Sequence, residues 1–395
     1  MGRPLGNFAD KMYCGRFSTS GDVLLTAGQD AVINLFDAER VYQWSARETD
    51  PDEDYHEEMP HDFFFGPRRR SHSRQRTLRA KRAAEEPKPF KTIQCRGIGW
   101  SIISTDFSPD GRWLAYSSWS RYTHLCNTYG EYELHEPLEF SPSKPDPFCL
   151  FSVQFSPSNT HILGGSSDNC LYLYSLERKQ QVSRFIAHDD DVNAVAFADQ
   201  GSQVVLSGGD DCMIKAWDLR SSDTAVGALC GHQAGITCIT PKGDGDGHHF
   251  ISNGKDQTLK LWDMRKMLSV TDDRIIDSTV LPAWDYRRHD PNQRRSRRGR
   301  NVHDCAVKTF HGHKVLQTLI QCYFSPQHTT GQRYVISGSS DGHVCIWDIL
   351  SGALVRSLSW HQEITRDVSW HPHLPLIASF SWDAAVGLWG YSAAC

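Results

Sequence analysis

The sequence predicts an all-β fold, a seven-bladed β-propeller with two long charged insertions. Three observations predict it: a motif that recurs seven times, short runs in which apolar and polar side chains alternate between turn sequences, and a lack of long amphipathic helical patterns. Radial repetition of small sheets leaves only short, protected edges for so many strands. We therefore expect a single domain over residues 1–395.

The repeated motif is a run of small residues, an aspartate and, six residues later, an aromatic residue. Its clear copies are Asp30 with Phe36, Asp168 with Tyr174, Asp211 with Trp217, Asp256 with Trp262, Asp341 with Trp347 and Asp383 with Trp389. A seventh, weaker copy has Ser120 and Cys126 at these places. The anchors are 90, 48, 43, 45, 85 and 42 residues apart. Four of these intervals match a blade period of about 40–45 residues, and the two long ones predict insertions.

These spacings give the expected limits of the blades and insertions. We expect blades near residues 11–43 plus 90–95, 98–145, 148–186, 188–230, 232–265 plus 305–310, 313–358 and 361–391, with insertions at 44–89 and 266–303. Propellers usually take the missing strand of their last blade from the N-terminus. Here about ten residues precede the first expected strand. The sequence therefore predicts either a weak closure or further residues upstream.

The two insertions are polar and strongly charged, and we expect mobile loops. The first has an acidic front half and a basic back half, and the second ends in a basic cluster at 294–300. Each follows a third-strand motif and precedes a candidate outer strand, so both are expected on the same face. The basic runs are open to three interpretations: solvated loops, a nuclear import signal, or a nucleic-acid contact. The acidic half argues against a phosphate-binding arm, and the net charge of −5 gives no basic footprint.

Four copies of the motif add a histidine upstream and a serine four residues before the aspartate. This pattern resembles that of WD40 repeats. The resemblance implies that Asp, His, Ser and Trp form a hydrogen-bonded network inside each blade. We therefore expect a structural role, not a catalytic or metal-binding one, for His188, Ser207, Asp211, Trp217; His232, Ser252, Asp256, Trp262; His313, Ser337, Asp341, Trp347; and His361, Ser379, Asp383, Trp389.

The remaining chemistry-bearing residues suggest no reaction. The sequence contains no phosphate-binding glycine-rich loop, no nucleophile elbow and no zinc-protease motif. The twelve cysteines are scattered without a CxxC pair, which favours reduced thiols in an intracellular protein, nuclear or cytoplasmic or both. We see no secretory signal and no membrane span. We expect no catalytic residues, no cofactor and no metal.

Two adjacent blades end in Trp-Asp-x-Arg, with Asp218 and Arg220 in one and Asp263 and Arg265 in the next. The doubled box resembles the WDxR box of substrate receptors of cullin-4 RING ubiquitin ligases. The resemblance implies that these arginines contact the adaptor, damage-specific DNA-binding protein 1. The alternative is that they are surface arginines paired with a neighbouring acid. Asn253 departs from the box, because it interrupts the small-residue run before Asp256.

Longer stretches, among them GWSIISTDFSPDG, LAYSSWSRYTHLCNTYGE and ISNGKDQTLKLWDMR, resemble the receptors of the LEC14B and WD-repeat protein 23 type, also called cullin-4-associated factor eleven. This resemblance implies a non-catalytic receptor with cullin-4, its adaptor and an unidentified protein substrate as partners. The competing hypothesis is a general nuclear scaffold for chromatin or RNA-processing complexes. No docking helix is readable in residues 1–10, and the first insertion is longer than expected for the family.

The face opposite the WDxR boxes should carry the turns around the repeat aspartates. Exposed tryptophan and arginine are the usual anchors of protein interfaces. Trp119, Arg121, Tyr122 and Trp382 lie in or beside such turns, and we expect them to contact substrate. The alternative is that they pack within or between blades.

Overall fold

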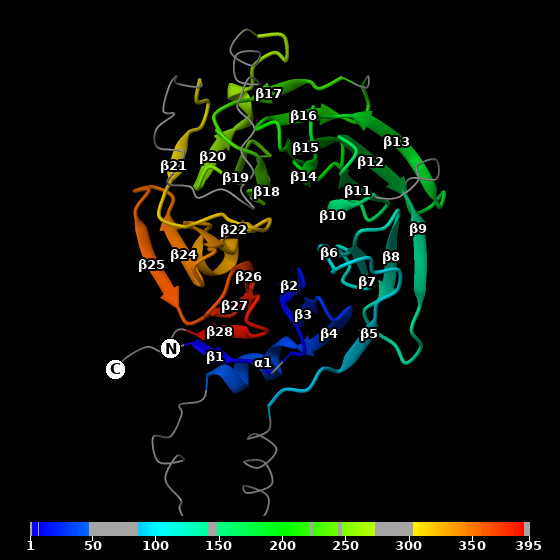
Figure 1. The fold of residues 1–395 in the computed structure, drawn as a ribbon, viewed down its shortest axis with the longest axis vertical. Coiled ribbons are helices and arrows are strands. Elements are labelled where there is room, and N and C mark those ends of the chain that lie inside the picture. Colours follow the sequence, from blue (N-terminus) through cyan, green and yellow to red (C-terminus); the bar gives the residue numbers. More distant parts are fainter. Residues whose placement is uncertain are drawn as a thin grey trace, which may run out of the picture.

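The predicted all-β, seven-bladed propeller is confirmed. The computed structural model describes residues 2–6, 8–46, 86–140, 148–221, 224–243, 247–272 and 303–390. Over these residues, seven four-stranded antiparallel sheets stand in a ring around a central axis (Figure 1). Within six of the sheets the strands pair in the order of the chain, so each sheet grows outward from the axis.

The strands fall into four concentric sets. The innermost strands are β2 (Met12–Phe17), β6 (Ser104–Phe107), β10 (Leu150–Phe155), β14 (Val192–Phe197), β18 (Ile236–Pro241), β22 (Cys322–Phe324) and β26 (Thr365–Trp370). The second strands are β3 (Val23–Gly28), β7 (Trp113–Ser117), β11 (His161–Ser166), β15 (Val204–Gly209), β19 (His249–Gly254), β23 (Tyr334–Gly338) and β27 (Leu376–Ser381). The third strands are β4 (Val32–Asp37), β8 (Tyr122–Asn127), β12 (Cys170–Ser175), β16 (Ile214–Asp218), β20 (Thr258–Asp263), β24 (His343–Asp348) and β28 (Val386–Gly390). The outer strands are β5 (Lys91–Gln94), β9 (His135–Glu139), β13 (Gln180–Ile186), β17 (Gly227–Leu229), β21 (Lys308–Phe310), β25 (Leu354–Ser359) and β1 (Gly2–Pro4). We number the blades 1 to 7 from β2–β5 to β26–β28 with β1.

The hydrophobic core is divided among the contacts between blades. Among the described residues, each pair of neighbouring blades shares an apolar cluster. Between blades 4 and 5, for example, Leu206 and Ile214 pack with Phe250 and Trp262. Each blade therefore buries both of its faces against its neighbours, which explains why the strands are rich in apolar residues on both sides.

Polar side chains on the innermost strands join the blades around the central channel, a cavity of about 340 Å³ lined by all seven blades. In most of these contacts a side chain of one blade bonds the backbone of the next. Examples are Asp106 Oδ2 with Phe155 N (2.8 Å), Gln154 Oε1 with Phe197 N (2.8 Å), Thr240 Oγ1 with Cys322 O (2.7 Å) and Ser369 Oγ with Phe17 N (3.0 Å). Backbone groups that face the channel thereby find partners without a shared sheet.

The ring is closed by the first strand of the chain. Strand β1 pairs with β28 in antiparallel register, with Arg3 opposite Leu388 (Figure 1). Although β1 has only three residues, Leu5 follows it into the apolar cluster between blades 7 and 1 and is fully buried. The residues before the first predicted strand therefore supply the fourth strand of blade 7, which the sequence analysis left undecided.

A helix that the sequence analysis did not predict reinforces this closure. Helix α1 (Ala38–Ser45) follows β4 directly, and Asp37 caps its N-terminus by accepting a bond from Arg40 N. Its apolar side chains Val41 and Trp44 are buried against blades 7 and 1. Arg3 lies 3.9 Å over the Trp44 ring and donates to the Trp44 carbonyl at 2.7 Å. The expectation of a loop from residue 44 onward was thus wrong for Trp44 and Ser45, which are the last two residues of this eight-residue helix.

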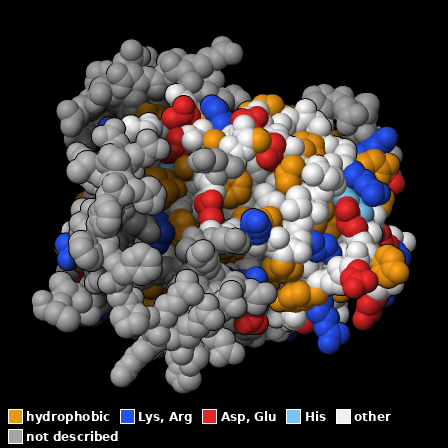
Figure 2. Space-filling model, turned by 90° about the horizontal axis from the view of Figure 1, so that it is seen from below, with side chains coloured by type: hydrophobic (Ala, Val, Ile, Leu, Met, Phe, Trp, Pro, Cys, Tyr) orange, Lys and Arg blue, Asp and Glu red, His pale blue; other side chains and the backbone are white. Residues whose placement is uncertain are grey.

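The insertions begin in the connections from β4 to β5 and from β20 to β21. Residues 47–85 and 273–302, and with them the predicted mobility and the basic runs, lie outside the described part of the chain. Among the described residues, two more short helices are η1 (Met264–Lys266) after β20 and α4 (Gln327–Thr330) after β22. On the side of the molecule shown in Figure 2, acidic and basic side chains are interspersed with apolar ones over the described residues, so this surface has mixed charge.

Candidate functional site

Strand topology assigns the predicted site residues to two opposite faces of the ring. In an antiparallel blade the first-to-second and third-to-fourth connections share one face, and the second-to-third turns lie on the other. We call the first the arginine face, because it carries Arg220 after β16 and Arg265 after β20. We call the second the tryptophan face, because it carries Trp119 after β7 and Trp382 after β27.

Each WDxR arginine on the arginine face is held in a fork by the aspartate two residues before it. Arg220 donates from Nε and Nη2 to the two oxygens of Asp218 at 2.9 and 2.7 Å. Arg265 donates likewise to Asp263 at 2.9 and 2.8 Å. The arginine side chains remain 66% and 63% exposed, whereas the Asp263 side chain is only 11% exposed. The guanidinium groups are therefore presented to solvent in a fixed orientation.

The carboxylates that hold these arginines stay ionised at physiological pH. The Arg220 guanidinium and backbone N–H lower the pKa of Asp218 to about 2. The Arg265 guanidinium lowers the pKa of Asp263 to about 2, against the opposing effect of burial. Both aspartates also accept a bond from the backbone N–H of their arginine at 3.0 Å. Two adjacent blades thus present the same rigid ion pair on one face.

The tryptophan face holds the residues predicted to contact substrate, but they differ in accessibility. Trp119 is 39% exposed and meets Phe151 edge-on. Trp382 is half-buried, lies against Tyr13 at 5.5 Å and is covered by Lys11 at 4.5 Å. The guanidinium of Arg121 lies 5.5 Å from the ring of Tyr122, next to it in sequence. The structure therefore separates one open tryptophan from one that packs between blades.

A further exposed tryptophan on this face was missed by the sequence analysis. Trp100, in the connection from blade 1 to blade 2, is 52% exposed and contacts Tyr13 edge-on at 5.4 Å. Its loop lies against the turn that carries Trp119, because a Cβ on Gly99 would come within 2.5 Å of the Trp119 carbonyl oxygen. The sequence could have indicated Trp100, since connections between blades lie on the same face as the second-to-third turns.

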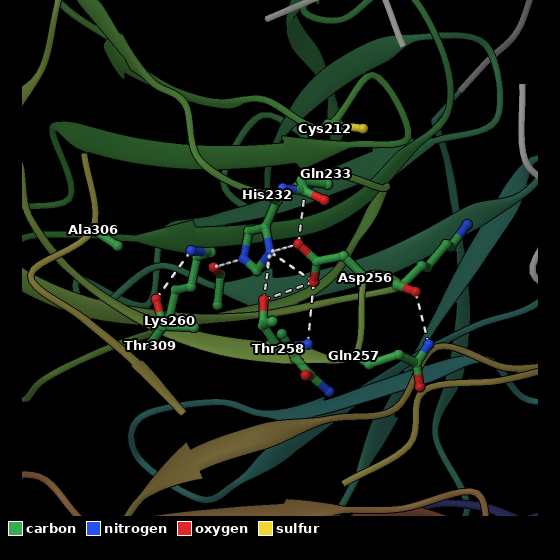
Figure 3. Close-up of polar contacts among 12 residues, drawn as sticks. Cys212, His232, Gln233, Asp256, Gln257, Thr258, Lys260, Ala306 and Thr309 are labelled. Carbon is green, nitrogen blue, oxygen red and sulfur yellow. Dashed lines mark hydrogen bonds and ion pairs between the residues drawn. The ribbon is translucent and has the colours of Figure 1, made fainter. Parts of the chain in front are cut away.

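Three of the four predicted polar chains inside the blades are formed by the described residues. In blade 5, Trp262 Nε1 donates to Ser252 (2.8 Å), and Ser252 bonds His232 Nε2 (2.7 Å). His232 Nδ1 in turn donates to Asp256 at 3.0 Å (Figure 3). The same sequence of bonds joins Trp217, Ser207, His188 and Asp211 in blade 4 and Trp389, Ser379, His361 and Asp383 in blade 7. Because every polar group in each of these three hydrogen-bonded networks has a partner, the burial of these side chains is tolerated.

The fourth predicted chain, in blade 6, is not formed, and this prediction is corrected. His313 Nε2 donates instead to Asn253 Oδ1 at 2.7 Å, and Trp347 Nε1 donates to the His311 carbonyl at 2.9 Å. Ser337 donates to the Gln321 and Gly338 carbonyls, and Asp341 bonds Ser339 and His343. The cause is Asn253 of blade 5, the residue that interrupts the small-residue run, which reaches across and captures the histidine.

His313 is therefore a buried histidine without a carboxylate partner, and burial lowers its pKa to about 4. Burial, with the neighbouring His135, also lowers the pKa of His124 to about 4. Neither ring nitrogen of His124 finds a hydrogen-bond partner among the described residues. Both rings are neutral at pH 7.

Because of these two histidines, we expect the free energy of unfolding to fall with pH already above the pH range in which carboxylates take up protons. The unfolded chain takes up a proton near pH 6.5, whereas the folded chain does not until about pH 4, so protonation favours unfolding between these values. The stabilisation is complete above about pH 6.5 and is lost as pH falls. From pH 7 to pH 5 we expect the free energy of unfolding to drop by about 2 kcal/mol per histidine. Urea unfolding at both pH values measures it. His313→Gln should reduce the drop by about 2 kcal/mol, and an unchanged drop would contradict this assignment.

Among the residues that the structure describes, no cluster of three or more histidine, cysteine or acidic side chains could hold a metal ion. Within the same residues, no helix has the length and apolar character that a membrane crossing requires.

The ring of repeats defines the class of the protein. The family model of the WD domain, G-beta repeat, matches residues 145–175, 179–218, 224–263, 305–348 and 352–390, and the chain belongs to the WD40-repeat proteins. The match begins after blade 2, in keeping with the weaker motifs of blades 1 and 2, where Phe36 and Cys126 stand in place of tryptophan.

Within this class the chain is homologous to two named groups. It is 40% identical over 316 residues to the LEC14B homolog of Prunus armeniaca and 39% identical over 313 residues to the LEC14B protein of Lithospermum erythrorhizon. It is 34% identical over 316 residues to the DDB1- and CUL4-associated factor 11 homolog of Caenorhabditis elegans. Each alignment covers 76% of this chain, but only 65% of the plant relatives and 53% of the nematode one.

Proposed function

We propose that this chain is a non-catalytic substrate receptor of a cullin-4 RING ubiquitin ligase. The arginine face binds the adaptor, damage-specific DNA-binding protein 1 (DDB1), through Arg220 and Arg265. The tryptophan face presents a protein substrate for ubiquitination. The observation that carries the proposal is the pair of forked arginines, exposed on one face of two adjacent blades. The name of the nematode relative, a DDB1- and CUL4-associated factor, supports it.

Fixed arginines suit such an interface for a physical reason. A free arginine loses side-chain freedom when it binds, and this loss offsets part of the binding energy. Here Asp218 and Asp263 have already restricted the guanidinium groups, which present planar donors suited to carboxylates and carbonyls. On the opposite face, Trp119 and the neighbouring Trp100 offer exposed ring surface for a substrate.

Adaptor recovery tests the proposal. In an affinity pull-down from cells, the wild-type protein should recover DDB1 and cullin-4, and Arg220→Ala with Arg265→Ala should reduce recovery at least tenfold, because arginines buried at an interface are frequent hot spots. Melting curves should show both proteins folded, since surface substitutions rarely alter stability by more than about 0.5 kcal/mol.

Two double variants serve as matched controls. Arg40→Ala with Arg112→Ala removes the same charge from blades 1 and 2 of the arginine face, and Trp100→Ala with Trp119→Ala alters only the tryptophan face. Both should recover the adaptor normally. Failure of the wild-type protein to recover DDB1, or equal losses in all three variants, would refute the proposed docking.

A further inference from the structure

Blade 6 contains a third exposed arginine that pairs with the aspartate at the end of a third strand, and no WDxR box predicts it. Asp348 follows Trp347 in blade 6 as Asp218 follows Trp217 in blade 4. Its carboxylate accepts a bond at 2.6 Å from Nε of Arg333, whose side chain is 59% exposed. Arg333 immediately precedes β23 and so comes from the first-to-second connection, which lies on the same arginine face. The arginine that pairs with this aspartate comes from a different connection than in blades 4 and 5, but its guanidinium is exposed on the same face.

The Arg333–Asp348 pair is held by a single guanidinium bond, but both of its residues are anchored by further contacts. Asp348 is buried and also accepts from the backbone N–H of Ser351 at 2.8 Å. The Ser351 N–H and the Arg333 guanidinium lower the pKa of Asp348 to about 2, so it remains a carboxylate. The backbone of Arg333 is fixed as well, because its carbonyl accepts from Ile349 N at 2.9 Å.

The arrangement is confined to blades 4, 5 and 6 within the described part of the chain. At the place of Asp348, blades 2, 3 and 7 carry Asn127, Ser175 and Gly390. Blade 1 has Asp37, but this carboxylate caps helix α1 and lies 3.6 Å from the more exposed Arg40. Three consecutive blades thus each present an exposed arginine paired with the aspartate of the third strand.

The position of the WDxR arginine in blade 6 is occupied by a leucine. Leu350 is 79% exposed and presents an apolar side chain at a turn between charged groups. Lys308 donates to its carbonyl at 2.5 Å, and Lys308 and Lys266 add positive charge near the three arginines. A partner that covers this strip needs carboxylates opposite the cations and an apolar recess opposite the leucine.

We propose that the adaptor-binding surface extends across blade 6, with Arg333 as a third anchoring arginine and Leu350 as its apolar contact. The partner surface is acidic around an apolar recess. This inference rests on the proposed docking of the adaptor to the arginine face, and it adds to that docking a blade without a recognisable box. Arg333 and Leu350 contribute to affinity jointly with Arg220 and Arg265.

Binding of the purified full chain to purified DDB1 tests the extension, measured by biolayer interferometry at two salt concentrations. Arg333→Ala should weaken binding about fivefold to tenfold and reduce its salt dependence. Leu350→Asp should weaken it at least tenfold, because a charge would enter an apolar recess. Since Leu350 is almost fully exposed, this second variant keeps the test valid even if loss of Arg333 destabilises blade 6.

The controls separate the two proposals. Arg112→Ala, in the corresponding connection of blade 2, should bind like the wild-type protein. If the double variant of Arg220 and Arg265 loses affinity while Arg333→Ala and Leu350→Asp match Arg112→Ala, the extension to blade 6 is wrong and the docking on blades 4 and 5 stands. If the wild-type chain does not bind DDB1, both proposals fall.

Discussion

Substitution of Asp256 by alanine is expected to lower the free energy of unfolding by about 3 kcal/mol. The carboxylate is 5% exposed and accepts bonds from His232 Nδ1, Gln233 N (2.8 Å) and Thr258 Oγ1 (2.7 Å) (Figure 3). Despite burial, His232 and these donors hold the pKa of Asp256 well below its usual range. Alanine would leave buried donors without an acceptor, which costs more than the bonds themselves contribute.

Blade 6 supplies the matched control for this substitution. Asp341 occupies the same place in the repeat, but its side chain is 31% exposed and His313 bonds Asn253 instead. Asp341→Ala should therefore cost less than about 1 kcal/mol. Urea unfolding followed by tryptophan fluorescence measures both variants. Equal costs at the two positions would show that the His–Asp bond does not stabilise blade 5.

Substitution of Arg366 by methionine is the second change with a large expected effect, about 3–5 kcal/mol of unfolding free energy. Arg366 lies on β26, is 2% exposed, and donates to the carbonyls of Tyr13 and Ile103. It also donates to Thr318 Oγ1 at 3.2 Å. One buried side chain thus ties blade 7 to blades 1 and 2 and to the connection that enters blade 6. Methionine replaces the unbranched apolar stem of arginine but has no donors, so it leaves these acceptors unpaired.

Thermal melting is the simplest measurement for this variant, with Arg112→Met as an exposed control that should melt within about 2 °C of the wild-type protein. A large decrease for Arg366→Met together with unchanged strand content would show that the blades depend on this cross-link for docking. A melting temperature equal to that of the control would mean that the carbonyls are satisfied in another way.

The repeat was readable because each blade must satisfy the same constraints. The aspartate and the aromatic residue recur at a fixed spacing, so the number of blades follows from counting. Blade 2 was recognised despite Ser120 and Cys126 at these places, because its position in the period was fixed by its neighbours. The closing strand could not be judged in the same way, since three residues with glycine and proline carry little pattern.

The site was predictable only where it depends on one stretch of chain. Arg220 and Arg265 lie two residues from their aspartates, so the motif contains the contact. Arg333 lies fifteen residues before Asp348 and reaches it through the pairing of β23 with β24, which no local pattern reveals. Asn253 shows the opposite case, because its break in the small-residue run was visible, but its capture of His313 from the next blade was not.

The pairing of β1 with β28 also determines when the ring can become complete. Arg3 and Leu388 are opposite each other, although nearly the whole described chain separates them in sequence. During synthesis β28 leaves the ribosome after every other described strand. Until then, the side of blade 1 that packs against blade 7 stays uncovered. Contacts between such distant segments form slowly, because a very long loop must close first. In a chain stalled before residue 386, Leu5, Val41 and Trp44 would lack the β28 side chains on which they pack, and this exposed apolar surface would make the chain a substrate for chaperones.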